Sequence, residues 1–159
     1  MRIRPATVLD VPALAALHEV SWVDTYTGLV GPAVIARATT NLEERWGENI
    51  AAPANSTWVA IVDEELVGFI LLGAVGPGHP SPLTIRALYV HPDHLGQGIG
   101  TALLDYATGD MSVYTWALKG NDRGMKFWTS RGFVACAEET SERYGGAPLV
   151  QLVRGGDHD

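Results

Sequence analysis

Three glycines at alternate positions, Gly96, Gly98 and Gly100, form the part of the sequence best suited to bind a ligand. They follow an apolar run at 88–90 and precede a helix-forming segment at 101–106. A glycine has no Cβ, so the backbone can turn tightly or approach a ligand closely. The first amides of a helix have no partner within the helix, and the helix dipole favours negative charge there. The pattern therefore predicts a site for a phosphate or pyrophosphate group.

Two common phosphate-binding loops fit this spacing poorly. A P-loop has Gly-Lys-Ser/Thr after its glycines, whereas Gly100 is followed by Thr101 and Ala102, without a lysine. A dinucleotide fingerprint is G-x-G-x-x-G with an acidic residue about 20 residues further on, whereas the spacing here is G-x-G-x-G. Nucleoside triphosphate and dinucleotide binding are therefore disfavoured. The alternative without a ligand is a glycine turn that only links a strand to a helix.

A second motif begins at Asn121 and ends at Gly132 followed by a phenylalanine. Asn121 is a suitable N-cap for a helix, and Gly132 suits the left-handed residue that ends it. Phe127 and Trp128 would give this helix its apolar body. Between the two motifs, the alternating, β-branched segment 111–118 predicts a strand.

Together the two motifs resemble those of the GCN5-related N-acetyltransferase (GNAT) superfamily. The run Leu-Tyr-Val-x-Pro-x-x-x-Gly-x-Gly-x-Gly-x-x-Leu-Leu at 88–104 is similar to its acyl-coenzyme A loop. The Asn121 motif is similar to its N-x-x-A-x-x-F-Y-x-x-x-G-F helix. The resemblance implies transfer of an acetyl group from acetyl-coenzyme A to a primary amine of a small molecule or peptide. The alternative is a non-catalytic acyl-coenzyme A-binding or regulatory module.

The resemblance also implies a coenzyme A site. Backbone groups of the strand at 88–90 would pair with the pantetheine arm, and loop amides would hold the pyrophosphate. A backbone N–H near Tyr89 would polarise the thioester carbonyl. In this family two central strands splay apart here, which in this chain are 83–90 and 111–118. The expected coenzyme A-binding residues are Leu88, Tyr89, Val90, Leu95, Gly96, Gln97, Gly98, Ile99, Gly100, Thr101 and Asn121.

The chain departs from the family pattern at three chemically important places. Leu95 stands where Arg or Gln usually precedes the first glycine, so one side-chain contribution to the loop is missing. Trp128 stands where a tyrosine commonly protonates the leaving thiolate. Thr84 and Arg86 occur where many relatives carry a glutamate base. An alkylammonium with a pKa of about 10 must lose a proton before it attacks, so direct attack needs a base that this position does not supply.

The general acid and base are therefore unassigned, and the candidates lie near the first predicted helix or beside the central strand. For each candidate, a solvated or capping role is the alternative. Trp22, together with Tyr26, is expected to line the acceptor pocket, with plain core packing as the alternative. Acceptor specificity is expected from region 22–46 and from the loops 73–82 and 141–148. The catalytic candidates are Glu19, Asp24, Tyr26, His79 and His91.

A fold of strands and helices must position these residues. Apolar spacing predicts a helix after Asp10 and a second helical region from about 33 to 49. We expect a single-domain α/β (α+β) acyl-CoA N-acyltransferase fold, with a mixed twisted sheet of about six to seven strands and helices on both faces. This domain would span residues 1–154, followed by a polar tail at 155–159. Further strands are expected at 58–62, 66–72, 83–90, 134–140 and 149–154.

Composition narrows the class of protein. The chain has 159 residues, 47% of them hydrophobic, which suits one domain with a sizeable core. With 11 Lys and Arg against 18 Asp and Glu, its net charge of −7 argues against a nucleic-acid surface. The N-terminal residues lack the apolar core of a signal peptide, and no apolar run approaches a membrane span. We therefore expect a cytoplasmic protein with no nucleic-acid or membrane partner.

The single cysteine, Cys136, excludes a disulfide within the chain. Its position in a predicted strand favours a buried, inert residue over a nucleophile. No metal site is predicted, although His158 and Asp159 at the C-terminus carry ligand atoms. A homodimer is expected by analogy with the family, with the apolar last strand at 149–153 as its contact.

Overall fold

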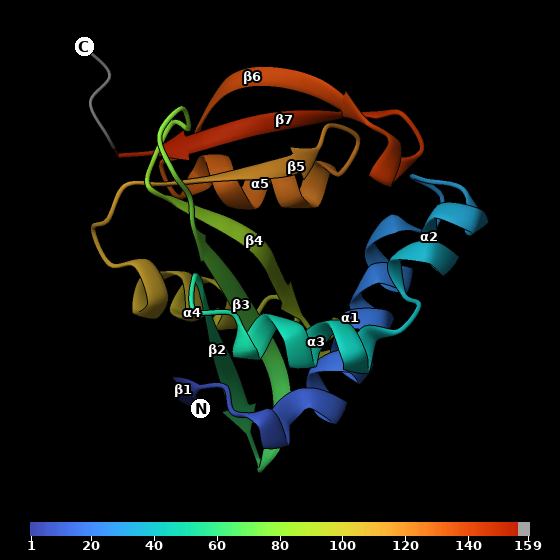
Figure 1. The fold of residues 1–159 in the computed structure, drawn as a ribbon, viewed down its shortest axis with the longest axis vertical. Coiled ribbons are helices and arrows are strands. Elements are labelled where there is room, and N and C mark those ends of the chain that lie inside the picture. Colours follow the sequence, from blue (N-terminus) through green and yellow to red (C-terminus); the bar gives the residue numbers. More distant parts are fainter. Residues whose placement is uncertain (156–159) are drawn as a thin grey trace.

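In the computed structural model, which describes residues 1–155, a seven-stranded sheet runs through the protein (Figure 1). The strand order is β1-β2-β3-β4-β5-β7-β6, and all neighbours are antiparallel except β4 and β5. The predicted mixed α/β fold is confirmed. The strands are β1 (Arg2–Pro5), β2 (Asn55–Val62), β3 (Glu65–Ala74), β4 (Leu83–Val90), β5 (Val113–Leu118), β6 (Val134–Ser141) and β7 (Ala147–Arg154).

Helices cover both faces of the sheet (Figure 1). On one face α1 and α3 pack on β2, β3 and β4, and on the other α4 and α5 share a core with the same strands. The helices are α1 (Val11–Tyr26), α2 (Pro32–Ala38), α3 (Leu42–Ala51), α4 (Ile99–Thr108) and α5 (Asp122–Ser130). Short 3-10 turns are η1 (Val8–Asp10), η2 (Pro92–His94) and η3 (Glu142–Tyr144).

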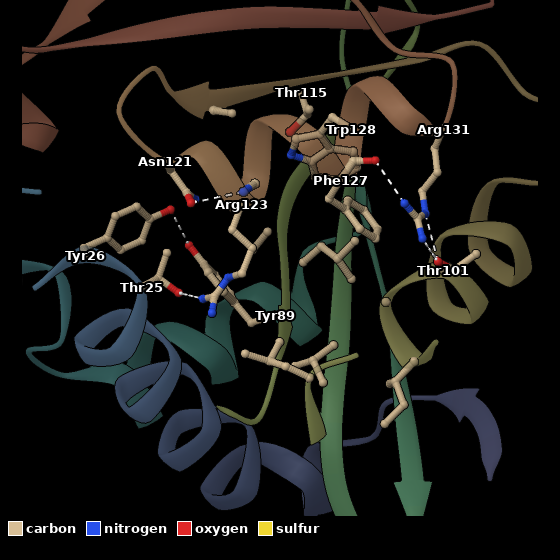
Figure 2. Close-up of a pocket in the computed structure, with 18 of the residues that line it drawn as sticks. Thr25, Tyr26, Tyr89, Thr101, Thr115, Asn121, Arg123, Phe127, Trp128 and Arg131 are labelled. Atoms are coloured by element: carbon tan, nitrogen blue, oxygen red, sulfur yellow. Dashed lines mark hydrogen bonds between the residues drawn. The ribbon is translucent and has the colours of Figure 1, made fainter. Parts of the chain in front are cut away.

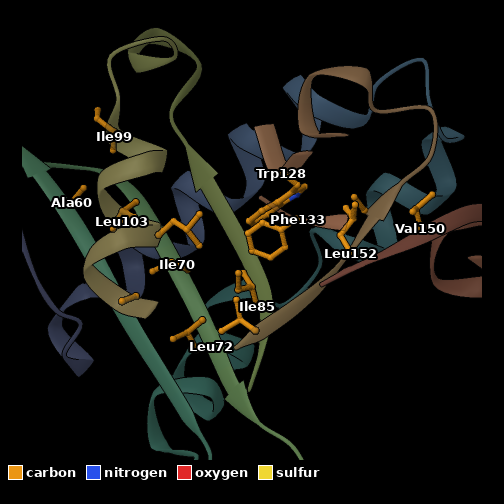
Figure 3. Packing of buried hydrophobic residues seen from close by; sticks show 14 of the residues in the cluster. Ala60, Ile70, Leu72, Ile85, Ile99, Leu103, Trp128, Phe133, Val150 and Leu152 are labelled. Carbon is orange, nitrogen blue, oxygen red and sulfur yellow. The ribbon is translucent and has the colours of Figure 1, made fainter. Parts of the chain in front are cut away.

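Successive side chains of β3 point alternately into the two hydrophobic cores on either face of the sheet. Phe69 and Leu71 pack against α1 and α3, whereas Ile70 and Leu72 pack with Leu103 and the residues of α4 and α5 (Figure 3). Such a strand, covered on both faces, reads as a continuous apolar run. Gly68 lets α4 approach closely, because a Cβ there would lie 3.0 Å from Leu103 Cδ1.

The single helical region predicted for residues 33–49 is wrong in one respect, because it is two helices, α2 and α3. Thr39 and Thr40 donate their side-chain hydroxyls back to the carbonyls of Ile35 and Ala36, which ends α2. Asn41 then adopts a left-handed conformation with φ 56° before α3 starts. Asparagine is one of the few residues besides glycine that tolerate this conformation.

An ion pair joins β1 to the start of α1. Arg4 donates from Nη1 and Nη2 to the two carboxylate oxygens of Asp10 at 2.8 and 2.9 Å, and the Thr7 N–H donates to the same carboxylate at 2.8 Å. The hydrogen bonds from Arg4 hold the pKa of Asp10 below its usual range.

The edge strand β6 corrects the prediction for Cys136. Its residues from Val134 to Thr140 are exposed, and Cys136 is exposed with them, because no helix covers this strand and β7 alone pairs with it. By contrast, β7 lies between β5 and β6, and its Leu149 and Leu152 are buried. The apolar side chains offered as a dimer contact are thus part of the core, and the homodimer itself stays a prediction.

The central strands β4 and β5 pair at only two positions, Thr84 with Tyr114 and Ile85 with Thr115. Beyond them the strands diverge, as the family resemblance implies. Arg86 is the extra residue of a β-bulge in β4 at this point, because β3 pairs with Ala87 and Ile85 but skips it. The edge of β4 from Leu88 to Val90 is therefore open toward β5. The predicted tail falls almost wholly at residues 156–159, outside the described residues.

Candidate functional site

The divergence of β4 and β5 opens a cleft with a cavity volume of about 280 Å³ (Figure 2). At one end it is lined by the glycine loop, the start of α4 and α5, and at the other by the end of α1 and by η3. The cleft therefore connects the two faces of the sheet. Of the eleven residues expected to bind coenzyme A, all line it except Gln97, which is exposed and hydrogen-bonded to His94 at 3.2 Å.

Glycines shape the end of the cleft at α4. Gly96 and Gly98 have φ of +77° and +81°, a left-handed conformation that other residues adopt at a cost. No atom lies within 4 Å of where their Cβ atoms would be, so both border open space. Gly98 is the N-cap of α4. The unpartnered amides of this helix start thus lie at the cleft, in the arrangement that suits a phosphate.

Arg131 brings positive charge to this end, and the sequence reasoning missed it. Its Nε donates to Thr101 Oγ1 at 2.8 Å, and its guanidinium carbon lies 4.1 Å from the centre of the Phe127 ring (Figure 2). Arg131 immediately precedes Gly132, so the signal was present within the second motif. It supplies a cation beside a loop in which Leu95 supplies none.

Asn121 caps α5 at the wall of the cleft. Its Oδ1 accepts from the Gly124 N–H at 3.1 Å, as predicted for an N-cap. A Cβ on Gly124 would lie 2.6 Å from Asn121 Nδ2, so the glycine leaves room for the amide. Trp128 also lines the cleft, about two turns further along the same helix.

Three tyrosines gather at the other end of the cleft. The hydroxyls of Tyr26 and Tyr89 lie 3.1 Å apart (Figure 2), and Tyr144 of η3 joins them in the lining. Burial raises the pKa of all three phenols, so they are protonated hydrogen-bond donors at neutral pH. Trp22 stacks on Tyr144 with ring centres 5.5 Å apart, but it is 2% exposed and does not line the cleft.

Tyr144 was also missed as a single residue, since the sequence indicated only the loop 141–148. The two acidic candidates lie outside the cleft lining. Glu19 is exposed on α1, and Asp24 is exposed and forms an ion pair with Arg123 at 3.4 Å. Arg123 itself lines the cleft and reaches across to Asp24 from the first turn of α5.

Neither histidine candidate lines the cleft. His79 is exposed and hydrogen-bonded to the Tyr114 hydroxyl at 2.9 Å. His91 Nδ1 accepts from the Asp93 N–H at 3.1 Å, so it caps η2. Of the five catalytic candidates, Tyr26 alone is part of the cleft lining among residues 1–155.

A different histidine, His18, lies buried behind the tyrosines. Trp46 donates its indole N–H to His18 Nδ1 at 3.1 Å, and the His18 ring centre is 5.8 Å from that of Tyr89. Burial, followed by the positive charges of Arg45 and Arg143, lowers the pKa of His18 to about 4. His18 is therefore neutral, and its proton resides on Nε2 because Nδ1 accepts a hydrogen bond.

Residues 1–155 contain no group of three or more His, Cys, Asp or Glu placed to hold a metal ion. Within the same residues, no helix has the length and apolar character needed to cross a bilayer.

Comparison with known proteins agrees with this geometry. The family model described as an acetyltransferase (GNAT) domain matches residues 53–135, which is 83 of the 159 residues. The curated protein "Probable N-acetyltransferase Rv2775" of Mycobacterium tuberculosis is 28% identical over 141 residues, covering 84% of this chain and 79% of its own length.

Two solved structures share the fold. The PaiA N-acetyltransferase of Thermoplasma acidophilum, solved in complex with coenzyme A, has a TM-score of 0.78 at 22% identity, covering 94% of this chain and 96% of its own. A GCN5-related N-acetyltransferase of Rhodopseudomonas palustris has a TM-score of 0.75 at 23% identity, covering 98% and 95%. At these identities the likeness concerns the fold.

Proposed function

The chain belongs to the GNAT acetyltransferase family, and from this we propose that it transfers an acetyl group from acetyl-coenzyme A to a primary amine of a small molecule or peptide. The observation that carries the proposal is the cleft between β4 and β5, which combines an open strand edge with a glycine-lined helix start.

The residues of the cleft fit coenzyme A. Gly96 and Gly98 leave the start of α4 open to a pyrophosphate, and Arg131 adds a positive charge beside it. The open edge of β4 from Leu88 to Val90 offers backbone groups to the amides of the pantetheine arm, as a sheet edge does to an added strand. Asn121 lines the same cleft, which supports its proposed contact with the pantetheine arm.

When bound, acetyl-coenzyme A supplies a thioester whose acyl carbon the amine attacks, with loss of the thiol. The chain's contribution is placement and polarisation. A free backbone N–H of β4 near Tyr89 would donate to the thioester carbonyl oxygen and stabilise the negative charge that develops there. Tyr26 is the proposed catalytic candidate, and its raised pKa makes its hydroxyl a donor rather than a base.

A second candidate function is an acyl-coenzyme A-binding module without turnover. The specific observation in its favour is that no Asp or Glu of residues 1–155 lines the cleft, so no carboxylate there can accept the proton of an ammonium. Under the leading proposal that proton leaves through water.

The first test is thermal unfolding with and without acetyl-coenzyme A. A ligand at a hundredfold excess over its Kd stabilises the native state by about 2.7 kcal/mol, which for a chain of this size raises Tm by roughly 5–10 °C. Gly98→Trp should abolish the rise by filling the space at the start of α4. Gly78→Trp is a matched control, because Gly78 also has positive φ (+91°) and open space but lies outside the cleft.

The second test is release of free thiol from acetyl-coenzyme A in the presence of a panel of primary amines, with product mass to identify the acetylated amine. Turnover supports the transferase. A Tm rise that Gly98→Trp removes, without thiol release for any amine, would establish the binding module instead. Absence of any Tm rise at millimolar ligand would refute both.

A further inference from the structure

The acceptor end of the cleft is positively charged, although the chain as a whole has a net charge of −7. Arg86 and Arg123 line the cleft, and Arg143 lies beside the Tyr144 ring of the acceptor end, 6.0 Å from its centre. No Asp or Glu in the described part of the chain lines the cleft. Arg123 is partly neutralised by its ion pair with Asp24.

Of the arginines that line the cleft, Arg86 alone has no side-chain partner among residues 1–155. No residue in 1–155 forms a hydrogen bond or ion pair with its guanidinium, which lies against Gly73 on β3. A Cβ on Gly73 would be only 2.2 Å from Arg86 Nε. Because Gly73 does not have a left-handed conformation, the close approach of Arg86 is what favours glycine here.

The coenzyme A phosphates do not account for Arg86. Gly73 continues the alternation of Phe69 and Leu71, so Arg86 lies on the face covered by α1 and α3. The glycine loop and Arg131 lie at α4 and α5, on the opposite face. Arg86 also precedes Val90 by four strand residues, a distance of about 13 Å along β4.

The rest of this end is suited to an oxyanion and to a neutral amine. Tyr26 and Tyr89 share a hydrogen bond between their hydroxyls and line the cleft with Tyr144, so this end offers phenol donors and no carboxylate. The neighbouring arginines oppose an ammonium ion by like-charge repulsion. An α-amino group, with a pKa of about 7.7–8.0, loses its proton far more easily than a lysine-type amine at about 10.4.

Within the proposed transferase function, on which this inference rests, we propose that the acceptor is an amino acid-like compound, a primary amine that also bears an oxyanion, and that Arg86 binds the oxyanion. Polyamines and aminoglycosides, which are polycations, are poor acceptors. Arg86 therefore determines acceptor specificity.

The test compares matched amines that differ by one anionic group. Phenylalanine is paired with phenethylamine, which lacks the carboxylate, and phosphoethanolamine with ethanolamine, which separates phosphate from carboxylate recognition. Spermidine and kanamycin represent polycations. The ratio of kcat/KM within each pair is measured by thiol release. The same pairs are titrated calorimetrically against protein saturated with coenzyme A, so that selectivity is measured even without turnover.

Two variants examine Arg86, and one serves as control. Arg86→Gln removes the charge, and Gly73→Ala displaces the guanidinium while leaving it present. Both should reduce the preference for the anionic member of a pair roughly ten- to a hundredfold, the usual range for a hydrogen bond to a charged group, with an unchanged KM for acetyl-coenzyme A. Arg2→Gln, at an exposed residue of the edge strand β1, should change nothing.

Each outcome decides between the two proposals. The inference is supported if the wild type prefers the anionic amine and both Arg86→Gln and Gly73→Ala reduce that preference. Faster turnover of phenethylamine or spermidine overturns it and leaves the transferase function intact. Arg86-dependent binding of the anionic amine without turnover of any amine supports the site and refutes the transferase function. If the anionic amines are neither bound nor turned over, the inference is overturned. Turnover of other amines then decides whether the transferase function holds.

Discussion

The buried histidine of α1 makes the stability of the fold depend on pH. In the native state the pKa of His18 is lowered from 6.5 to about 4, by burial first and by Arg45 and Arg143 next. The unfolded chain binds a proton at this side chain below pH 6.5, whereas the native protein does not until about pH 4. Between these values the unfolded state holds more protons, so stability falls as the pH is lowered.

The size of the effect follows from the two pKa values. Between about pH 7.5 and about pH 5, linkage predicts a loss of about 2 kcal/mol from this one group. For a domain of this length that corresponds to a decrease in Tm of roughly 4–8 °C. Protonation of Nδ1 would also break the hydrogen bond from Trp46, so no relaxed protonated state is available in the fold.

Urea unfolding at several pH values, for wild type and His18→Gln, measures this contribution. A glutamine carbonyl can accept from Trp46 but does not titrate, so the variant lacks the pH-dependent part while keeping an acceptor. The free energy of unfolding of the wild type should fall by about 2 kcal/mol more than that of the variant. Parallel pH profiles for the two proteins would show that His18 is not held neutral in the core.

Three further outcomes are expected. Arg131→Gln should weaken acetyl-coenzyme A binding about tenfold and reduce its dependence on salt, measured by titration calorimetry. Gly68→Ala should destabilise the fold by about 1–3 kcal/mol through overpacking. Because the clash is with Leu103 Cδ1, the double variant with Leu103→Ala should lose less free energy of unfolding in chemical denaturation than the two single variants together. Asp10→Asn should cost about 1–3 kcal/mol at neutral pH, and because the pKa of Asp10 is lowered, the difference from wild type should shrink as pH falls below about 3.8.

The parts of the fold with a strong local signal were predictable. The hairpin of β2 and β3 is a pair of apolar runs around a polar turn, and the glycine loop combines turn chemistry with a helix start. The break after α2 was not, because it depends on threonine hydroxyls returning to carbonyls of the preceding turn and on Asn41 adopting positive φ. Both are local choices that apolar spacing does not record.

Most residues expected to bind coenzyme A line the cleft, and their binding role stays a prediction, whereas the other end of the cleft was anticipated only in part. The loop residues are contiguous, and their spacing carries the information. Tyr26 was expected there, but Tyr144 and Arg86 were not assigned to it, because residues of α1, η3 and β4 are distant in the sequence and only the complete fold brings them to one cleft. Cys136 was misjudged because a β-branched and small-residue strand has the same composition whether it lies in the centre or at an uncovered edge.

The short pairing of β4 with β5, at only two positions, also has a consequence for biosynthesis. Apart from the two pairs between β4 and β5, the strand partners of β1 to β4 lie within the first 108 residues, and α4 packs on them there, whereas β5 to β7 otherwise pair among themselves. A nascent chain can therefore fold the part from β1 to α4 before β5 to β7 leave the ribosome, since chains fold from the N-terminus as they are synthesised. Ribosome-bound chains stalled beyond α4 should already resist protease. The cleft would be completed last, when β5 to β7 pack against β4.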